Sequence, residues 1–309
     1  MAIAAVGQIC STASVKANLD QCVRLVSKAA GGGAKVLFLP EASDYIAHDA
    51  RESLALAQPQ ASSAFVQGLC AAARSHSMAV HVGIHEPVRR QDVAVSKLLN
   101  RTVYISAAGE VVDAATYDKL HVFDYGGLRE SDTVQAGAGL TAPFDSPVGR
   151  IGSLICFDVR FAEPALALAQ PGPRSAWCRR PAQILTYPSA FTLRTGQAHW
   201  ETLLRGRAAE TQSWVVAAAQ VGRHNAARAS YGRSLVVDPW GEVSVRLGGV
   251  EDGGVEEIGF VDMDMGLWET VRREMPLKRR SGSVWPVPVV WTVFVMFDHI
   301  WPHVELVRP

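Results

Sequence analysis

The sequence lacks a surplus of charge of either sign. Its 309 residues hold 30 Lys and Arg against 30 Asp and Glu, which gives a formal net charge of +0. Nucleic acids and anionic membrane surfaces bind proteins through a basic surplus or patch, and no such patch stands out along the chain. We therefore expect no nucleic-acid partner. With 48% hydrophobic and 19% charged residues, the composition is that of a folded protein.

An apolar run long enough to cross a membrane is also lacking. The longest uncharged apolar run, residues 284–297, is shorter than the roughly 20 residues of a spanning helix, and it contains Pro286 and Pro288. Met1 leads directly into a strand-like stretch at residues 3–9, without the pattern of a signal or transit peptide. The sequence thus indicates a cytoplasmic protein with no membrane span, and a mitochondrial form is the alternative.

Motifs for nucleotides and metals are scarce. The glycines at residues 31–33 end a predicted helix, whereas phosphate-binding glycines follow a strand and open a helix. His81 and His85 share one face of a predicted strand, but no HExxH motif or paired CxxC motif accompanies them. We therefore expect no cofactor and no metal site.

Cysteine is sparse and odd in number. Five cysteines without a secretory leader favour reduced thiols over a disulfide framework. Cys22 and Cys70 lie on apolar faces of predicted helices, and Cys10 ends a strand. Cys178 stands beside two arginines but has no base near it in its loop. Cys156 is the candidate reagent among the five.

Strand-like and helix-like segments alternate through residues 1–280, which predicts an α/β layered fold. Short turns between apolar runs, at residues 107–110, 146–149 and 238–241, predict hairpins and therefore mixed sheets. No linker or repeat divides this part of the chain, so we predict a single domain although the length alone suggests two.

Two stretches do not fit the alternation. Residues 171–181 combine proline and arginine and predict an exposed loop. Residues 284–309 form a hydrophobic C-terminal tail with three of the eight tryptophans and only three charged residues. We expect this tail to bury itself against the domain or a partner.

Cys156 occupies a position suited to a nucleophile. It follows a predicted buried strand at residues 151–155 and precedes residues 157–161, which are predicted to open a helix. Open α/β sheets place ligands at the carboxyl ends of their strands, and a helix N-terminus favours a thiolate. The alternative is a small hydrophobic core residue, the more frequent fate of a free cysteine.

Two charged residues accompany Cys156 at predicted strand ends. Glu41 follows the strand at residues 36–39, and Lys119 follows the strand that ends at Tyr117. Either residue alone is more often a surface charge. Together the three supply a nucleophile, a proton acceptor and a cation for a developing oxyanion.

A papain-like pairing of Cys156 with His121 or His199 is the rival arrangement. His199 lies in a predicted helix, where a packed or hydrogen-bonded imidazole is the more frequent outcome.

Three ordered blocks give the chain a family resemblance. Residues 38–41 (Phe-Leu-Pro-Glu), 117–124 (Tyr-Asp-Lys-Leu-His-Val-Phe-Asp) and 155–161 (Ile-Cys-Phe-Asp-Val-Arg-Phe) resemble the nitrilase superfamily of carbon-nitrogen hydrolases. The resemblance covers nearly all of residues 1–283, which we take as the hydrolase domain, with residues 284–309 as an atypical tail. It implies an α-β-β-α sandwich of the nitrilase type that commonly forms homodimers.

The resemblance also assigns roles to site residues. It implies that Glu41 is the general base, Lys119 the stabiliser of the tetrahedral intermediate and Cys156 the nucleophile. Glu130 matches a second glutamate that orients the lysine and helps to place the substrate. The backbone N–H of Phe157 is expected to assist Lys119 at the oxyanion.

Later blocks resemble one branch of the superfamily, which hydrolyses deaminated glutathione to 2-oxoglutarate and cysteinylglycine. Arg160 and Thr195 match substrate contacts of that branch, and a guanidinium suits a carboxylate or 2-oxo acid by bidentate pairing. We therefore expect a cysteine-dependent amidase that forms a thioester and acts on a small amide bearing carboxylate or α-keto acid groups. The blocks are residues 185–191, 195–201, 222–224 and 230–234.

Two alternatives stay open. An ω-amidase acting on 2-oxoglutaramate or 2-oxosuccinamate shares the same machinery, and a catalytically idle interaction scaffold would keep the fold alone. The chain departs from the family at Arg233, where histidine is usual, in the longer loop at residues 171–181 and in the tail. The tail occupies a region that often contributes to the dimer contact.

Overall fold

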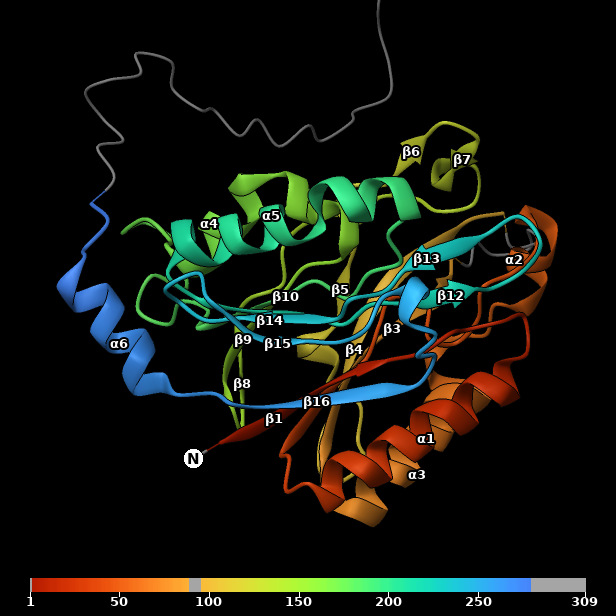
Figure 1. Ribbon diagram of the computed structural model, residues 1–309, viewed down its shortest axis with the longest axis horizontal. Helices are drawn as coiled ribbons and strands as arrows, with labels where there is room; N and C mark the ends of the chain where they lie inside the picture. Colours follow the sequence, from red (N-terminus) through yellow and green to blue (C-terminus); the bar gives the residue numbers. More distant parts are fainter. Residues whose placement is uncertain (1, 89–95, 279–309) are drawn as a thin grey trace, which may run out of the picture. The chain divides into compact units, whose positions relative to one another are not determined.

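The computed structural model describes residues 2–88 and 96–278. Two six-stranded sheets form its centre, and both mix parallel with antiparallel neighbours (Figure 1). The first sheet has the order β16 (Glu257–Asp262), β1 (Ile3–Gln8), β2 (Val36–Phe38), β3 (Ala79–Pro87), β4 (Leu98–Ile105), β5 (Tyr117–Asp118). The second has the order β15 (Val243–Arg246), β14 (Leu235–Val237), β11 (Trp214–Ala217), β10 (Ile184–Thr186), β9 (Gly149–Ser153), β8 (Phe144–Ser146). Two-stranded pairs are β6 (Asp124–Tyr125) with β7 (Leu128–Arg129), and β12 (Val221–Arg223) with β13 (Ala229–Tyr231).

Helices cover the outer faces of the two sheets. On the first sheet lie α1 (Val15–Gly31) and α3 (Ala64–His76), and on the second lie α4 (Ala162–Ala169) and α5 (Leu193–Thr211) (Figure 1). The remaining helices are α2 (Ala50–Leu56) and α6 (Met265–Glu274). Side chains cap several N-termini: Ser14 accepts from the Ala17 N–H, Ser63 from Val66 and Thr192 from Thr195. None of the helices in the described ranges is long and apolar enough to span a bilayer.

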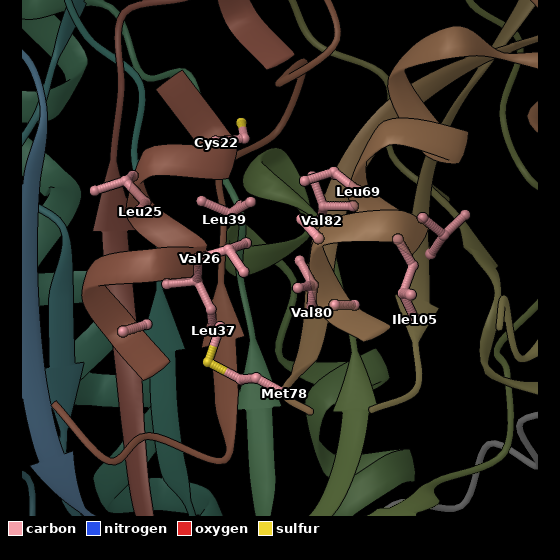
Figure 2. Packing of buried hydrophobic residues seen from close by; sticks show 14 of the residues in the cluster. Cys22, Leu25, Val26, Leu37, Leu39, Leu69, Met78, Val80, Val82 and Ile105 are labelled. Carbon is pink, nitrogen blue, oxygen red and sulfur yellow. The ribbon is translucent and has the colours of Figure 1, made fainter. Parts of the chain in front are cut away.

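Three hydrophobic clusters establish the layers. One fills the space between α1, α3 and the first sheet (Figure 2), and a second lies between α4, α5 and the second sheet. The third joins the inner faces of the two sheets. Strand β2 shows how sequence alternation builds this order, because Leu37 packs toward the helices while Val36 and Phe38 pack toward the other sheet. The order helix, sheet, sheet, helix confirms the predicted α-β-β-α sandwich with mixed sheets.

Local details differ from the sequence predictions. The predicted hairpin at residues 107–110 turns at Gly109, whose φ is 74°, but its return is a single bridge from Ile105 to Val111 rather than a strand. Residues 156–160 form a 3-10 helix, and α4 begins only at Ala162.

The loop at residues 171–181 contains only exposed or half-buried residues, as predicted, and one side chain anchors it. The Trp177 Nε1 donates to the Ala167 carbonyl at 2.7 Å, and its ring packs on the cluster beneath α4. One compact unit spans Met1–Met275. The predicted tail at residues 284–309, and the domain boundary at residue 283, lie outside the described residues.

Candidate active site

Glu41 is held where the chain leaves β2. The Gly83 N–H donates to the Pro40 carbonyl at 3.0 Å, and the Ser43 N–H donates to the Gly83 carbonyl at 2.9 Å. A Cβ atom on Gly83 would lie 2.6 Å from the Glu41 Cα, so this close approach of two backbones requires glycine. The Gln220 Nε2 also donates to the Glu41 carbonyl, at 3.0 Å. Glu41 is therefore fixed through its backbone on two sides.

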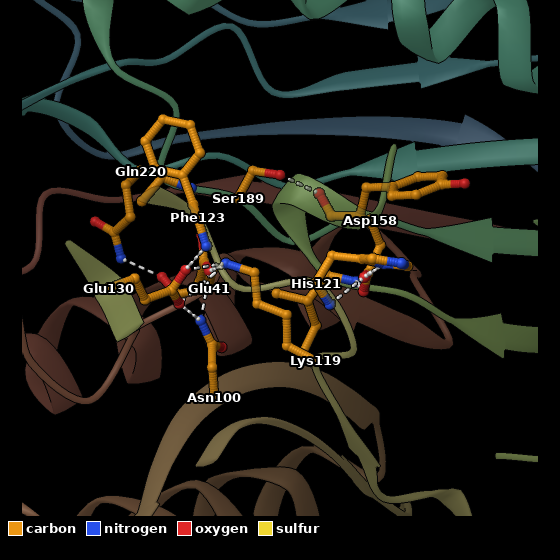
Figure 3. A network of polar contacts seen from close by, with 12 residues as sticks. Glu41, Asn100, Lys119, His121, Phe123, Glu130, Asp158, Ser189 and Gln220 are labelled. Carbon is orange, nitrogen blue, oxygen red and sulfur yellow. Dashed lines mark hydrogen bonds and ion pairs between the residues drawn. The ribbon is translucent and has the colours of Figure 1, made fainter. Parts of the chain in front are cut away.

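Lys119 follows β5 and is almost fully buried, with 2% of its surface exposed. Its Nζ donates to Glu41 Oε1 at 2.9 Å and to both carboxylate oxygens of Glu130, at 3.0 and 2.9 Å (Figure 3). Its backbone N–H donates to the Asn100 carbonyl at 2.8 Å, which ties the lysine to β4. One buried ammonium thus bridges two carboxylates.

Asn100 completes this network, although the sequence analysis did not single it out. Its Nδ2 donates to Glu41 Oε1 at 2.6 Å and to Glu130 Oε1 at 2.9 Å. No local signal marked it, because Asn100 is the first of three consecutive polar residues in β4, which reads Leu-Leu-Asn-Arg-Thr-Val-Tyr-Ile. A buried amide needs hydrogen-bond partners, and here both are site carboxylates.

Cys156 arrives from the second sheet. It follows β9 and starts the 3-10 helix with a φ of 45°, a left-handed conformation that non-glycine residues rarely adopt. Its N–H donates to the Pro188 carbonyl at 3.0 Å, and its thiol is among the groups that lower the pKa of Glu41. The Ala190 N–H donates to Glu41 Oε2 at 2.8 Å. The carboxylate of Glu41 therefore connects the two sheets at the site.

The charges at the site follow from burial and contact. Burial acts to raise the pKa of Glu41, but the Lys119 ammonium and hydrogen bonds from Lys119, Cys156 and Asn100 outweigh it and leave the pKa lowered. Burial opposes the charged form of Lys119, yet Glu130 and Glu41 hold its pKa well above the ordinary value. Burial and the Glu41 charge raise the pKa of the Cys156 thiol. The resting site contains a carboxylate, an ammonium and a neutral thiol.

From the sequence, the position of Cys156 was expected to favour a thiolate, while Glu41 was expected to act as the general base. The expected thiolate depended on a helix N-terminus next to Cys156, and a 3-10 helix of five residues stands there instead. A short helix contributes little dipole, whereas burial and the carboxylate both oppose ionisation. Such a thiol becomes nucleophilic when Glu41 accepts its proton during attack.

The rival cysteine–histidine pairing finds no counterpart in the geometry. His121 Nδ1 lies 2.7 Å from Asp158 Oδ1, and the His121 ring stacks on Phe161. His199 Nδ1 lies 3.1 Å from Arg160 Nη2. Both imidazoles thus have partners other than Cys156, which faces Glu41.

Asp158 is a second residue that the sequence analysis missed. It is fully buried and accepts hydrogen bonds from the Tyr117 hydroxyl, the Ile155 N–H, and the N–H and ring of His121. These bonds join Tyr117 and His121, on either side of Lys119, to the segment that carries Cys156, and Figure 3 shows Asp158 beside His121. A carboxylate two residues after the candidate nucleophile was the available signal.

The site opens into a cavity of about 330 Å³. Glu41, Lys119, Glu130 and Cys156 all line it, so four predicted site residues meet at one cavity. The other three candidates, Phe157, Arg160 and Thr195, line a smaller adjoining cavity that also contains Cys156.

The three candidates of the smaller cavity have partners of their own. The Arg160 guanidinium lies 5.6 Å from the Phe157 ring centroid and 5.8 Å from that of Phe191. Thr195 Oγ1 lies 2.8 Å from Thr192 Oγ1 at the start of α5. Arg233 lines neither of these cavities, because its guanidinium pairs with Glu251 and its carbonyl accepts from Trp200 Nε1. Within residues 2–88 and 96–278, no three His, Cys, Asp or Glu side chains gather as a metal site.

Comparisons with known proteins agree with this architecture. The profile of the family described as carbon-nitrogen hydrolase matches residues 3–273. Probable hydrolase nit2 of Schizosaccharomyces pombe is 42% identical over 91% of this chain and 98% of its own length. Deaminated glutathione amidase of Homo sapiens is 42% identical over 89% of this chain and 80% of its own length. The crystal structure of the C. elegans NitFhit protein has a TM-score of 0.78 at 36% identity, covering 91% of this chain and 66% of that longer one. The chain therefore belongs to the carbon-nitrogen hydrolase family, as the sequence resemblance predicted, and is a hydrolase of amide carbon–nitrogen bonds.

Proposed function

We propose that the chain is a cysteine-dependent amidase that hydrolyses deaminated glutathione to 2-oxoglutarate and cysteinylglycine. The observation that carries the chemistry is the contact of one buried ammonium, Lys119, with the carboxylates of Glu41 and Glu130 beside the buried thiol of Cys156. The similarity to curated deaminated glutathione amidases supports the choice of substrate.

The reaction begins with proton transfer. Glu41 accepts the proton of the Cys156 thiol while the sulfur attacks the amide carbonyl carbon. The oxyanion that forms is stabilised by the Lys119 ammonium, with the Phe157 N–H as a second donor. Glu130 and Asn100 hold the ammonium and the base in position during this step.

Collapse of the tetrahedral intermediate breaks the carbon–nitrogen bond. The leaving amine takes the proton from Glu41, and the acyl group stays on Cys156 as a thioester. Glu41 then accepts a proton from water as the water oxygen attacks the thioester carbonyl carbon. Collapse of this second tetrahedral intermediate breaks the carbon–sulfur bond and releases the acid, and the proton on Glu41 returns to the sulfur, which restores the Cys156 thiol and the Glu41 carboxylate. These steps use protein groups and water alone.

The smaller cavity, of about 20 Å³, offers groups that suit the carboxylate end of the acyl half of the substrate. Arg160 offers a guanidinium between two aromatic rings, and Thr195 with Thr192 offers hydroxyl groups. A 2-oxo acid carries the carboxylate and carbonyl oxygens that such donors pair with.

An ω-amidase is the second candidate, because 2-oxoglutaramate presents the same 2-oxo acid end to Arg160. The deciding measurement compares release of cysteinylglycine from deaminated glutathione with release of ammonia from 2-oxoglutaramate. We expect deaminated glutathione to be preferred in kcat/KM. A preference of more than tenfold for 2-oxoglutaramate would replace our proposal with the ω-amidase.

The role of Cys156 is tested by Cys156→Ala, with Cys70→Ala as a matched control because Cys70 is partly buried on α3, away from both cavities. We expect hydrolysis to vanish in the first variant and to persist in the second. Unchanged hydrolysis in Cys156→Ala would reject the assigned nucleophile. A folded wild type without activity on any of these amides would favour the idle scaffold.

The homodimer and the cytoplasmic location stay predictions. Light scattering on the full chain at micromolar concentration tests the first, and we expect twice the mass of the 33.3 kDa chain. Cell fractionation tests the second.

A further inference from the structure

The larger cavity contains an arginine, Arg228, that takes no part in the proposed bond-breaking steps. Arg228 precedes β13 in the turn that joins β12 to β13, and it lines the same cavity as Cys156 and Lys119. It is partly buried. Among the described residues, no hydrogen bond or ion pair engages its guanidinium. Arg129, which also lines the cavity, has a carboxylate partner in Asp132 at 3.5 Å.

The turn that carries Arg228 is held in place. Asn225 Oδ1 accepts hydrogen bonds from the N–H groups of Ala227 and Arg228, both at 2.9 Å. The Asn225 Nδ2 donates to the carbonyl of Ala47, another residue that lines the cavity, at 3.1 Å, which fixes the turn to that segment. The backbone of Arg228 is thus ordered before any ligand binds, so binding orders only its side chain.

The two cavities meet at Cys156. Phe123, Cys156 and Ala190 line both, while Arg160 belongs to the smaller cavity and Arg228 to the larger. When an amide carbonyl sits at the Cys156 sulfur, the acyl half and the amine half of the substrate extend in different directions. Both cavities contain arginine: Arg160 in the smaller, and Arg228 beside the Asp132-paired Arg129 in the larger.

An anionic leaving group can bind in the larger cavity only if a cation there is free to pair with it, because carboxylates line the wall. The cavity lining includes Glu41, Glu130, Asp49 and Asp132, and the first two share the single ammonium of Lys119, which neutralises only one of the two charges. Carboxylates on the wall repel a substrate carboxylate unless a cation stands ready for it. The larger cavity also has the volume for the longer half of the substrate.

We propose that Arg228 binds the carboxylate of the amine half of the substrate, the glycine carboxylate of the cysteinylglycine portion. This rests on the proposed function. The enzyme then recognises a dianionic amide with one guanidinium on each side of the scissile bond. Selection between a dipeptide leaving group and ammonia lies in Arg228, because only the former carries a carboxylate to pair with it.

The test crosses two proteins with three substrates. The proteins are wild type and Arg228→Gln. The substrates are deaminated glutathione, its C-terminal glycinamide, which lacks the charge, and 2-oxoglutaramate, which lacks the whole dipeptide. A hydrogen-bonded pair between charged groups predicts a loss of about 10- to 100-fold in kcat/KM for Arg228→Gln on deaminated glutathione, mainly through KM. On the glycinamide and on 2-oxoglutaramate the two proteins should differ by less than about threefold.

Controls separate this role from damage to the fold. Arg223→Gln removes the same charge from an exposed position on β12 and should leave all three substrates unaffected. Arg228→Lys keeps the charge and should restore part of the lost affinity for deaminated glutathione. An equal loss on all three substrates would overturn the proposal, as would a wild type indifferent to the glycinamide change. Wild type without activity on deaminated glutathione would instead reject the proposed function.

Discussion

Asn100 offers the sharpest test of how the site sets the charge of its base. The change Asn100→Ala removes the Nδ2 donor that lies 2.6 Å from Glu41 Oε1 and 2.9 Å from Glu130 Oε1. Glu41 keeps its contacts with the Lys119 ammonium and the Ala190 N–H. Asn100 is one of the groups that lower the pKa of Glu41, so its removal raises that pKa.

The magnitude follows from the hydrogen bond. A bond to a charged group contributes about 1.5 to 3 kcal/mol, and 1.36 kcal/mol corresponds to one pKa unit. Water in the vacated space replaces part of it, so we expect the pKa to rise by about one unit. The base works in its ionised form, and activity disappears as the pH falls through its pKa. A higher pKa therefore moves the acid limb of the profile to higher pH.

The assay is kcat/KM for amide hydrolysis between about pH 4 and 9, which reports the free enzyme. The plateau near neutral pH should change by only a few-fold, while the acid limb of Asn100→Ala moves up by about one unit. The control is Thr102→Val on the same face of β4, since Thr102 is buried and its hydroxyl has no partner among the described residues. An unmoved acid limb in a folded Asn100→Ala enzyme would refute the reasoning.

Three further changes probe other parts of the structure. Lys119→Met leaves the carboxylates of Glu41 and Glu130 in the site without their cation, so the free energy of unfolding in urea should fall by about 3 to 5 kcal/mol. A decrease below about 1 kcal/mol would contradict the charge assignment. Gly83→Ala brings a Cβ within 2.6 Å of the Glu41 Cα, so kcat should fall at least tenfold in a folded enzyme. An unchanged kcat would show that the close approach of Gly83 does not position Glu41. Burial lowers the pKa of His81 to about 3 from an ordinary 6.5, so the imidazole stays neutral in the folded protein. Below pH 6.5 only the unfolded chain binds this proton, so the free energy of unfolding should decrease by up to about 1.4 kcal/mol per pH unit. Urea titrations at several pH values check this, and His81→Gln should flatten the slope; an equal slope in both proteins would assign the pH dependence elsewhere.

The sequence allowed the strand ends to be predicted well, and with them the candidate site. Glu41 and Cys156 each follow a short apolar run, which marks both as residues at the carboxyl end of a strand. The sequence did not show that these two strands belong to different sheets, which bring Glu41 and Cys156 together across the sandwich. The contacts of Asn100 were not predictable in the same way. They depend on how β4 pairs with β5 and on how the segment that carries Glu130 folds back, and neither is written in the local pattern around residue 100.

The helix after Cys156 was predicted to begin at residue 157, although the sequence contains a signal for a later start. Pro164 is tolerated in the first turn of a helix, so its position indicates a start near Ala162 rather than at residue 157. The expectation that Cys156 favours a thiolate followed from that error. A helix dipole was expected at this position, whereas burial and a carboxylate determine the pKa of the thiol.

The division of the site between two sheets has a mechanical consequence. Glu41 and Lys119 are attached to the first sheet and Cys156 to the second, and the sheets are joined by the cluster that contains Phe38 and Trp214. A displacement of about 1 Å between reacting groups costs on the order of 100-fold in rate. A small shift of one sheet relative to the other should therefore lower kcat. This loss of activity should appear under conditions in which the hydrogen bonds within each sheet are still intact.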